Sequence, residues 1–411
     1  MTKQKLWTKD FLLIAFTNLF IFLCFYSLMV TLTVYTIDKF HTSISIAGLA
    51  SSIFVIGAVL VRPFAGKRIA LIGPKKLLIA SLSVFFLSTL LYFAADNLNM
   101  LLCLRLIHGA AFGVASTATG TIVAEIIPPS RRGEGMGYFA ISTNIAMAIG
   151  PFIGLYISSA YEYTMVFTVS ILFAFISLVA SILLKYEQPA LTEGQIEGLK
   201  SHKLRDYFEY SAIPISITAG VIGFSYSSVL SHMTTFSQEI NLAGAASFFF
   251  VVYAVSLLVT RPFTGRWFDL RGENFVIYPS LILYALSLLI LGGSMNSGML
   301  LAAGAMMGIG LGTFQSSAQT IAIKEAPTHR IGLATSTFFV MYDIGIGIGP
   351  FLQGLAIPHF GYRGLYFIMG AIAFIGIVMY YFAHGRSAGR TINRGLKKFE
   401  SANSDKMFGK I

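Results

Sequence analysis

Charge is scarce in this sequence. Asp, Glu, Lys and Arg make up only 11% of its 411 residues, whereas 55% are hydrophobic and the mean hydropathy is +0.74. A typical soluble domain carries about 25% charged residues, so this chain has too few charges to cover the surface of a soluble globule of its size. The composition therefore predicts a protein that lies in a lipid bilayer.

Cysteines are scarce too, and the common motifs for nucleotides and metals are missing. Cys24 and Cys103 both fall in apolar runs and form no CxxC spacing, which excludes a disulfide framework and a cysteine-bound metal. The sequence has no GxxxxGKS/T loop for ATP and no HExxH zinc motif. We therefore expect no enzyme, no cofactor and no metal site.

Long apolar runs are what the sequence has in abundance. A helix needs roughly 18 or more apolar residues to cross a hydrocarbon core about 30 Å thick. We expect twelve such helices, at 10–36, 43–66, 74–95, 98–126, 134–158, 163–184, 208–235, 243–267, 275–293, 297–324, 331–356 and 362–384. No small-residue cleavage site follows the first run, so we expect it to be retained rather than removed as a signal peptide. The predicted fold class is an all-α integral membrane protein.

The basic residues predict the orientation of these helices. With the amino terminus in the cytoplasm, 26 of the 29 Lys and Arg fall on the cytoplasmic side, leaving Lys39, Arg105 and Arg363. This skew follows the positive-inside rule, so we expect a multi-pass protein of the cell (plasma or inner) membrane with both termini in the cytoplasm. Topology and contact with anionic lipid then explain the net charge of +11, and nucleic acid is not an expected partner.

The chain also contains an internal repeat. The stretch RPFAG (62–66) returns as RPFTG (261–265), an offset of 199 residues. The same offset joins Gly73 to Gly272, Gly109 to Gly308, Gly113 to Gly312, Pro128 to Pro327, Arg131 to Arg330, Gly150 to Gly349 and Pro151 to Pro350. We expect a six-helix bundle at 1–184, a cytoplasmic linker at 185–209, a second six-helix bundle at 210–384 and a basic cytoplasmic tail at 385–411. Two such repeats are typical of carriers that bind substrate near the membrane midplane.

The loops after the second helix of each half resemble a motif of the major facilitator superfamily. They read GKRIALIGPKK (66–76) and GRWFDLRGEN (265–274), against a family pattern of roughly GxLaDRxGRR. We interpret RPFAG and RPFTG as basic turns at the cytoplasmic face. The resemblance implies that the acid of this loop helps to hold the halves together; it is retained as Asp269 but is Ala70 in the first half.

A second stretch resembles the fourth helix of proton-coupled members of that superfamily. LLCLRLIHGAAFG (101–113) places Arg105 inside a helix and His108 on nearly the same face. A charge inside a membrane span is costly and should face a cavity or a partner. Arg105 and His108 are therefore candidates for a proton relay, with a hydrogen-bonded structural histidine as the alternative for His108.

Two acids complete the candidates for proton coupling. Asp343, the counterpart of Asn144 at the offset of 199, is the most deeply placed acid. It could bind a cation, carry a proton or pair with a basic residue across the halves; a hydrogen-bonded structural acid is the alternative. Asp38 follows the first helix, where some antiporters of the family carry an acid, although an exposed loop also explains it.

A third stretch resembles the fifth-helix signature of the twelve-helix drug:proton antiporters. GYFAISTNIAMAIGPFIG (137–154) keeps three glycines and the proline of GxxxxxxxxGxxxGPxxG, with Ala146 in place of one glycine. We expect its small residues to pack this helix against the other half. The residues expected to form the conformational switch are Arg62, Gly66, Gly73, Arg261, Gly265, Asp269, Gly272, Gly137, Gly150, Pro151 and Gly154.

In this family helices 1, 4, 7 and 10 line the substrate cavity. The resemblance therefore makes cavity candidates of the polar residues on those spans, which are Asn18, Tyr26, Ser116, Tyr226, His232, Gln315 and Gln319. The surrounding Phe and Met side chains suit bulky amphipathic ligands.

The predicted function is a proton-coupled exporter of a drug-like or amphipathic small molecule, acting as a monomer by alternating access. Two other carriers remain open: an exporter of a metal-chelating or anionic metabolite, whose carboxylates Arg105, His108 and His232 would receive, and a proton symporter for a sugar or organic acid. A membrane sensor or scaffold that transports nothing is the alternative from a different class.

Overall fold

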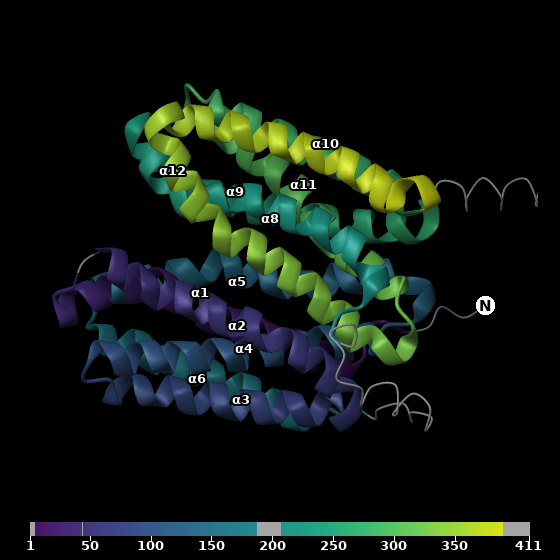
Figure 1. Ribbon diagram of the computed structural model, residues 1–411, viewed down its shortest axis with the longest axis horizontal. Helices are drawn as coiled ribbons and strands as arrows, with labels where there is room; N and C mark the ends of the chain where they lie inside the picture. Colours follow the sequence, from purple (N-terminus) through teal and green to yellow (C-terminus); the bar gives the residue numbers. More distant parts are fainter. Residues whose placement is uncertain (1–4, 43, 187–206, 389–411) are drawn as a thin grey trace, which may run out of the picture.

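The computed structural model describes residues 5–42, 44–186 and 207–388, and its elements are helices (Figure 1). The first half contains α1 (Lys9–Phe40), α2 (Ile44–Ile72), α3 (Pro74–Leu90), α4 (Leu98–Ile126), α5 (Arg132–Ala160) and α6 (Tyr163–Leu183). The second half contains α8 (Ile213–Glu239), α9 (Ala243–Arg271), α10 (Glu273–Gly292), α11 (Ser297–Lys324) and α12 (Ile331–Tyr380). Gly361, with φ 67° and ψ 174°, breaks α12 into two helical segments, 331–360 and 362–380. Most of the linker (187–206) and most of the tail (389–411) lie outside the described residues.

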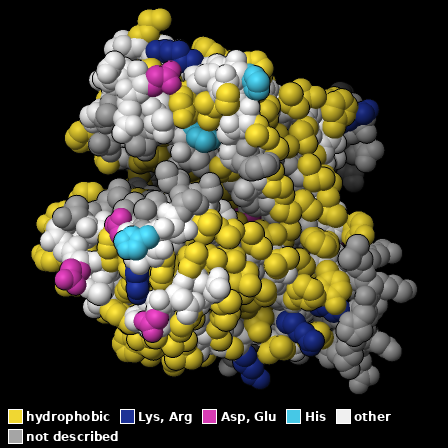
Figure 2. All heavy atoms as spheres, turned by 60° about the vertical axis from the view of Figure 1, so that its left-hand side comes forward, with side chains coloured by type: hydrophobic (Ala, Val, Ile, Leu, Met, Phe, Trp, Pro, Cys, Tyr) yellow, Lys and Arg dark blue, Asp and Glu magenta, His cyan; other side chains and the backbone are white. Residues whose placement is uncertain are grey.

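These helices have the length and surface that a membrane requires. Within the described residues, eleven segments are long and apolar enough to cross a bilayer, and α2, with 29 residues, joins them in length. Figure 2 shows hydrophobic side chains over much of the outer face of both halves. Several large apolar side chains are more than half exposed, among them Phe152, Phe248 and Phe382. Since lipid rather than water suits such a surface, the predicted all-α membrane fold is confirmed.

Each half forms its own bundle around its own core. In the first, the N-terminal bundle, α2 packs against α4, and α1 packs against α5 and α6. In the second, the C-terminal bundle, α8 packs against α12, and α9 packs against α11. One apolar core is built around residues such as Cys24 and Phe54, and the other around residues such as Tyr284 and Tyr366. Figure 1 shows the two bundles one above the other, with α12 running between them.

The repeat is visible in the helix caps. The side chain of Asn97 accepts a hydrogen bond from Met100 N at the start of α4, and that of Asn296 accepts one from Met299 N at the start of α11, both at 2.9 Å. The two asparagines are 199 residues apart in the sequence. An asparagine cap satisfies an N–H group that the first turn of a helix leaves free, so the same local rule starts both helices.

The RPFAG and RPFTG stretches do not form turns, and this expectation was wrong. α2 continues to Ile72 and α9 to Arg271, with Pro63 and Pro262 inside them. The turns come later, at Gly73 (φ 102°) and Gly272 (φ 87°), whose positive φ angles favour glycine. Each arginine of the repeat therefore lies inside a helix rather than among the charges of a loop.

The bundles meet most closely at one end of the molecule, which we call the linker end because Tyr186 and Tyr207, on either side of the linker, lie there. Two pairs of helices make this contact: α2 with the first segment of α12, and α5 with α9. We call them the α2/α12 seam and the α5/α9 seam. Away from the linker end the bundles diverge (Figure 1), and the turned view in Figure 2 shows a hollow between them.

Candidate functional site

Small residues bring the helices of the α2/α12 seam into close contact. A Cβ atom added to Gly66 would lie 2.6 Å from Ser336 Cβ and 2.9 Å from the Gly332 carbonyl oxygen. The Ser336 hydroxyl donates a hydrogen bond to the backbone carbonyl of Arg62, across the bundles. Position 66 therefore has no room for a side chain while this seam is closed.

The α5/α9 seam repeats this arrangement residue by residue. A Cβ atom added to Gly265 would lie 2.8 Å from Glu134 Cα and 3.0 Å from the Gly133 carbonyl oxygen, and one added to Gly137 would lie 3.9 Å from Gly265 Cα. The offset of 199 relates Gly66 to Gly265, Gly332 to Gly133 and Ser336 to Gly137. The two seams are thus pseudo-symmetric copies of each other.

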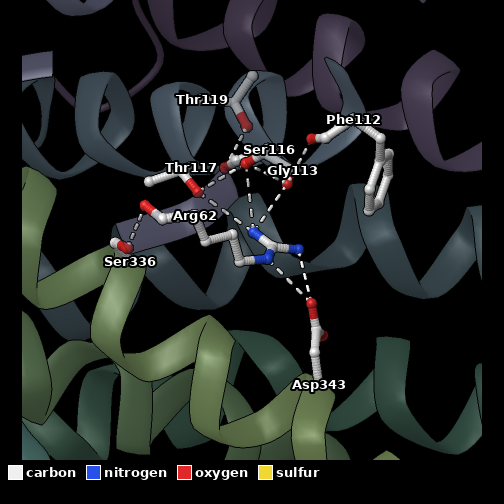
Figure 3. A network of polar contacts seen from close by, with 8 residues as sticks. All are labelled: Arg62, Phe112, Gly113, Ser116, Thr117, Thr119, Ser336 and Asp343. Atoms are coloured by element: carbon white, nitrogen blue, oxygen red, sulfur yellow. Dashed lines mark hydrogen bonds and ion pairs between the residues drawn. The ribbon is translucent and has the colours of Figure 1, made fainter. Parts of the chain in front are cut away.

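An ion pair joins the bundles one helical turn deeper than Gly66. Arg62 on α2 donates to Asp343 on α12, with Nε and Nη2 each 2.9 Å from Oδ2 (Figure 3). The Arg62 side chain is 2% exposed, and that of Asp343 is 19% exposed. A two-fold charge-assisted contact of this kind is strong and directional, so it fixes α12 relative to α2.

The N-terminal bundle holds the arginine of this pair in place. Arg62 Nη1 donates to Ser116 Oγ at 3.0 Å and to Thr117 Oγ1 at 3.2 Å, both on α4 (Figure 3). The Phe339 ring of α12 lies 4.7 Å from the guanidinium carbon. A buried ion pair repays its desolvation only when its remaining donors are satisfied, and these hydroxyls meet that condition. Removal of the carboxylate charge would leave a buried cation between the bundles.

Arg261, the counterpart of Arg62, has no such carboxylate. It lies on α9 and is 3% exposed, and it donates to the Gly312 carbonyl oxygen at 2.8 Å and to the Ser316 hydroxyl of α11. The position that corresponds to Asp343 holds Asn144. Among the described residues no carboxylate pairs with Arg261, and its Nε is buried without a hydrogen-bond partner. The α5/α9 seam therefore contains an uncompensated cation.

At the linker end it is the α5/α9 seam, and not the α2/α12 seam, that contains a carboxylate of the repeat. On α9, Asp269 accepts hydrogen bonds from the backbone nitrogens of Gly133 and Glu134, both at 2.9 Å, at the start of α5. Ala70, at the same place on α2, packs instead against Leu333 of α12. At this level α9 presents a carboxylate where α2 presents a methyl group.

Arg105 and His108 meet inside the N-terminal bundle. Tyr92 Oη lies 2.7 Å from His108 Nδ1 and accepts a bond from Arg105 Nη1 at 3.4 Å, while Arg105 Nε donates to the Ala50 carbonyl oxygen at 2.8 Å. Both residues are fully buried. The structure thus brings these two candidates together but places Asp343 elsewhere, against Arg62.

The cavity candidates of the N-terminal bundle have three different environments. Asn18 Nδ2 donates to Ser142 Oγ and Thr143 Oγ1, each at 2.8 Å, so it links α1 to α5 within the bundle. Ser116 holds Arg62, as described above. Tyr26 is half-buried and packs against the cores of both bundles.

The candidates of the C-terminal bundle are also spread out. Tyr226 donates to the sulfur of Met147 at 2.9 Å, across the bundles. Gln319 is buried and its Nε2 has no partner, whereas Gln315 is half-buried. His232 lies beside Tyr362, with 6.1 Å between the ring centroids, and its Nε2 has no partner.

The remaining candidates lie outside both seams. Asp38 is exposed near the end of α1 and accepts a bond from Tyr163 at 3.4 Å. Cβ atoms added to Gly150 and Gly154 would lie 2.7 Å from Tyr26 Cβ and 2.6 Å from the Ser27 carbonyl oxygen, within the same bundle. The expectation that these glycines pack α5 against the other half was therefore wrong. It holds for Gly137 alone among the three glycines, and Pro151 lies inside α5 between the other two.

The sequence reasoning missed several residues that form the seams or support contacts between the bundles, namely Ser336, Gly332, Gly133, Thr117 and Met147. The repeat carried a usable signal for some of them: the offset of 199 projects Gly133 onto Gly332 and Gly137 onto Ser336. No local pattern marks Met147.

Comparison with known proteins identifies the family. A model of the Major Facilitator Superfamily matches residues 14–275 and 215–407. A probable sugar efflux transporter of Mannheimia succiniciproducens is 22% identical, and the match covers 87% of this chain and 90% of the relative. The staphylopine export protein of Staphylococcus aureus is also 22% identical, and the match covers 82% of this chain and 86% of the relative. Multidrug resistance protein 1 of Bacillus subtilis is 25% identical, covering 84% and 89%. The crystal structure of the human organic anion transporter MFSD10 matches with a TM-score of 0.73 at 14% identity, covering 90% of this chain and 98% of that one.

Proposed function

Because the chain belongs to the Major Facilitator Superfamily of membrane transporters, we propose that it is a proton-coupled exporter of a drug-like or amphipathic small molecule. Three relatives support export, since their names describe sugar efflux, staphylopine export and multidrug resistance. In this proposal the protein works as a monomer in the cell membrane. Its linker end, termini and tail face the cytoplasm, as the distribution of basic residues favours.

The Arg62–Asp343 ion pair is the observation that carries the proposal. It joins the bundles at a depth where a charge needs a partner, and one of its members is a carboxylate that can take up a proton. Protonation of Asp343 removes the charge that Arg62 binds, so the contact that closes the α2/α12 seam weakens. The same step couples a proton to the relative position of the bundles.

The direction of coupling follows from the conformation. With the linker end closed, Asp343 is 19% exposed and takes up a proton from the outside through the hollow between the bundles. The seam then opens to the cytoplasm, where the proton leaves and the substrate enters. Re-formation of the ion pair closes the linker end again, and the substrate is released outside. One proton moves in as one substrate molecule moves out, which is antiport.

Proteoliposomes with an acidic lumen test this proposal, since an antiporter then accumulates its substrate. We expect the wild-type protein to accumulate rhodamine B, a fluorescent amphipathic dye that carries one carboxylate, above protein-free vesicles. Asp343→Asn should abolish accumulation driven by the pH gradient but keep dye exchange at equal pH. Asp96→Asn, which changes an exposed acid outside the seams, is the matched control.

Two results would contradict the proposal. The first is equal accumulation by the wild type with and without a pH gradient. The second is accumulation by Asp343→Asn that still follows the gradient. Accumulation only when the lumen is alkaline would indicate a proton symporter instead.

A further inference from the structure

Arg261 is a buried cation that the chain leaves without a counter-charge. It is 3% exposed, and it donates to two neutral groups, the Gly312 backbone carbonyl and the Ser316 hydroxyl. Its Nε is buried and free of any partner among the described residues. An isolated charge in a low-dielectric interior is costly unless an opposite charge joins it. The site is therefore incomplete without an anion.

The pseudo-symmetry of the seams shows from which side an anion would approach. On the α2/α12 seam, Ser336 contacts Gly66. Asp343 follows Ser336 by seven residues, and its partner Arg62 precedes Gly66 by four. On the α5/α9 seam, Asn144 lies seven residues after the Gly137 contact, and Arg261 lies four residues before Gly265. Asn144 and Arg261 are thus placed as Asp343 and Arg62 are, but the amide of Asn144 carries no charge.

We propose that Arg261 binds the carboxylate of the transported molecule, at the position that a carboxylate side chain occupies in the other seam. This inference rests on the proposed transport function and specifies its substrate class as an amphipathic carboxylate. A guanidinium offers parallel N–H donors that match the two oxygens of a carboxylate. A carboxylate ligand would supply the missing counter-charge, and one of its oxygens would lie within reach of the free Nε.

The surroundings of Arg261 suit an amphipathic anion. Gln319 lies on the same face of α11 as Gly312 and Ser316, one turn beyond Ser316, and its Nε2 is a second buried donor without a partner. Tyr253 lies on α9 about two turns before Arg261, and its ring stacks with that of Tyr226 at 6.5 Å between centroids. Donors beside aromatic rings favour a ligand with a charged end and an apolar body.

Two other buried arginines, Arg62 and Arg105, are less suitable than Arg261 as receptors for an anion between the bundles. Arg62 is already neutralised by Asp343. Arg105 also pairs with no carboxylate among the described residues, and its Nη2 is buried without a hydrogen-bond partner. It lies inside the N-terminal bundle rather than at a seam, where it donates to Ala50 and Tyr92 and its guanidinium lies 4.4 Å from the Phe54 ring centroid. The role of carboxylate receptor, which the sequence suggested for Arg105, is therefore assigned to Arg261.

Binding of a matched pair of fluorescent probes tests the inference. The full-length protein in nanodiscs is titrated with dansylglycine, an aromatic carboxylate, and with dansylglycinamide, its uncharged amide, at fixed ionic strength. We expect the wild type to bind the carboxylate about tenfold more tightly than the amide, as one good charge-assisted contact provides. Arg261→Gln should reduce this preference to about twofold or less. Arg271→Gln, which removes an exposed arginine from the same helix, should keep it.

A second variant tests the same site by addition. Asn144→Asp supplies the carboxylate that the α5/α9 seam lacks, so it should pair with Arg261 and abolish the preference for dansylglycine. Because it adds a favourable pair rather than removing one, this variant should fold even if Arg261→Gln does not. A wild type that binds both probes equally or binds neither overturns the inference, and so does a preference that survives in a folded Arg261→Gln or Asn144→Asp variant.

These titrations need no pH gradient, so they separate the two proposals. An Arg261-dependent preference in a protein whose dye accumulation ignores the pH gradient would support the anion site and refute proton coupling. Gradient-driven accumulation by a protein without that preference would support proton coupling and refute the anion site.

Discussion

The cap that Asp269 forms on α5 should control how firmly the linker end stays closed. Its two carboxylate oxygens each accept a bond of 2.9 Å from the first turn of α5, in the opposite bundle. Asp269→Asn removes the negative charge at this helix start and replaces one acceptor by an NH₂ group that faces an N–H donor. The variant therefore loses one hydrogen bond outright and weakens the other.

The size of the effect follows from these contacts. A hydrogen bond to a charged group contributes about 1.5–3 kcal/mol, and a charge at a helix N-terminus contributes about 0.3–1 kcal/mol. For a half-buried site we expect a loss of about 2–3 kcal/mol from the closed state. At 1.4 kcal/mol for each factor of ten, the closed-to-open ratio should fall by about 30- to 150-fold.

Distances between spin labels across the linker end measure this ratio. Ile72→Cys and Leu270→Cys place labels on exposed positions of the two bundles, in a Cys103→Ser background that leaves only the buried Cys24. The wild-type background should give mainly the short distance of the closed state. Asp269→Asn should add a population at a longer distance.

The opposite change, Ala70→Asp, serves as the matched comparison. It places a carboxylate opposite the first turn of α12, where Gly332 and Leu333 lie, so it should favour closure. Its effect should be smaller than that of Asp269→Asn because Ala70 is only 8% exposed and the new charge loses hydration. An unchanged distance distribution in Asp269→Asn, or a larger effect of Ala70→Asp, would refute this reasoning.

Two further predictions concern the seam glycines and the buried histidine. Gly66→Ala should abolish gradient-driven accumulation, because its Cβ would lie 2.6 Å from a side-chain carbon of the facing helix. Gly354→Ala, whose Cβ would have no atom within 4 Å, should keep wild-type flux. Equal flux in both variants would contradict the close packing at Gly66. Tyr92→Phe removes the hydroxyl shared by Arg105 and His108, so it should lower stability by about 1–3 kcal/mol in thermal unfolding and leave proton coupling intact. Loss of coupling in a folded Tyr92→Phe protein would instead support a proton relay through these residues.

The fold was predictable because helix length and hydropathy are local properties. The fourth helix was expected at 98–126 and is observed as Leu98–Ile126, since the apolar run begins at an asparagine cap. The end of α2 was not predicted correctly. Arg62 and Lys67 lower the local hydropathy and mimic a loop, but both are buried through contacts made by distant parts of the chain.

The functional site was predictable only in part, for the same reason. Asp343 stood out as a deeply placed acid, yet its partner lies 281 residues away and belongs to the other bundle. Local hydropathy carries no information about how two bundles dock. The repeat does carry some, because Asn144 could be identified as the counterpart of Asp343 before its surroundings were known.

The two seams contain their carboxylates at different depths, and this difference affects how the bundles can separate. In the proposed cycle the deep ion pair of the α2/α12 seam breaks when Asp343 takes up a proton from the hollow, whereas the Asp269 cap and the Arg266–Glu134 ion pair of the α5/α9 seam lie at the closed linker end. A proton therefore releases one side of the molecule first. We expect the first movement to be a tilt about an axis along α5 and α9, like a book opening along its spine, rather than an even parting of the two halves.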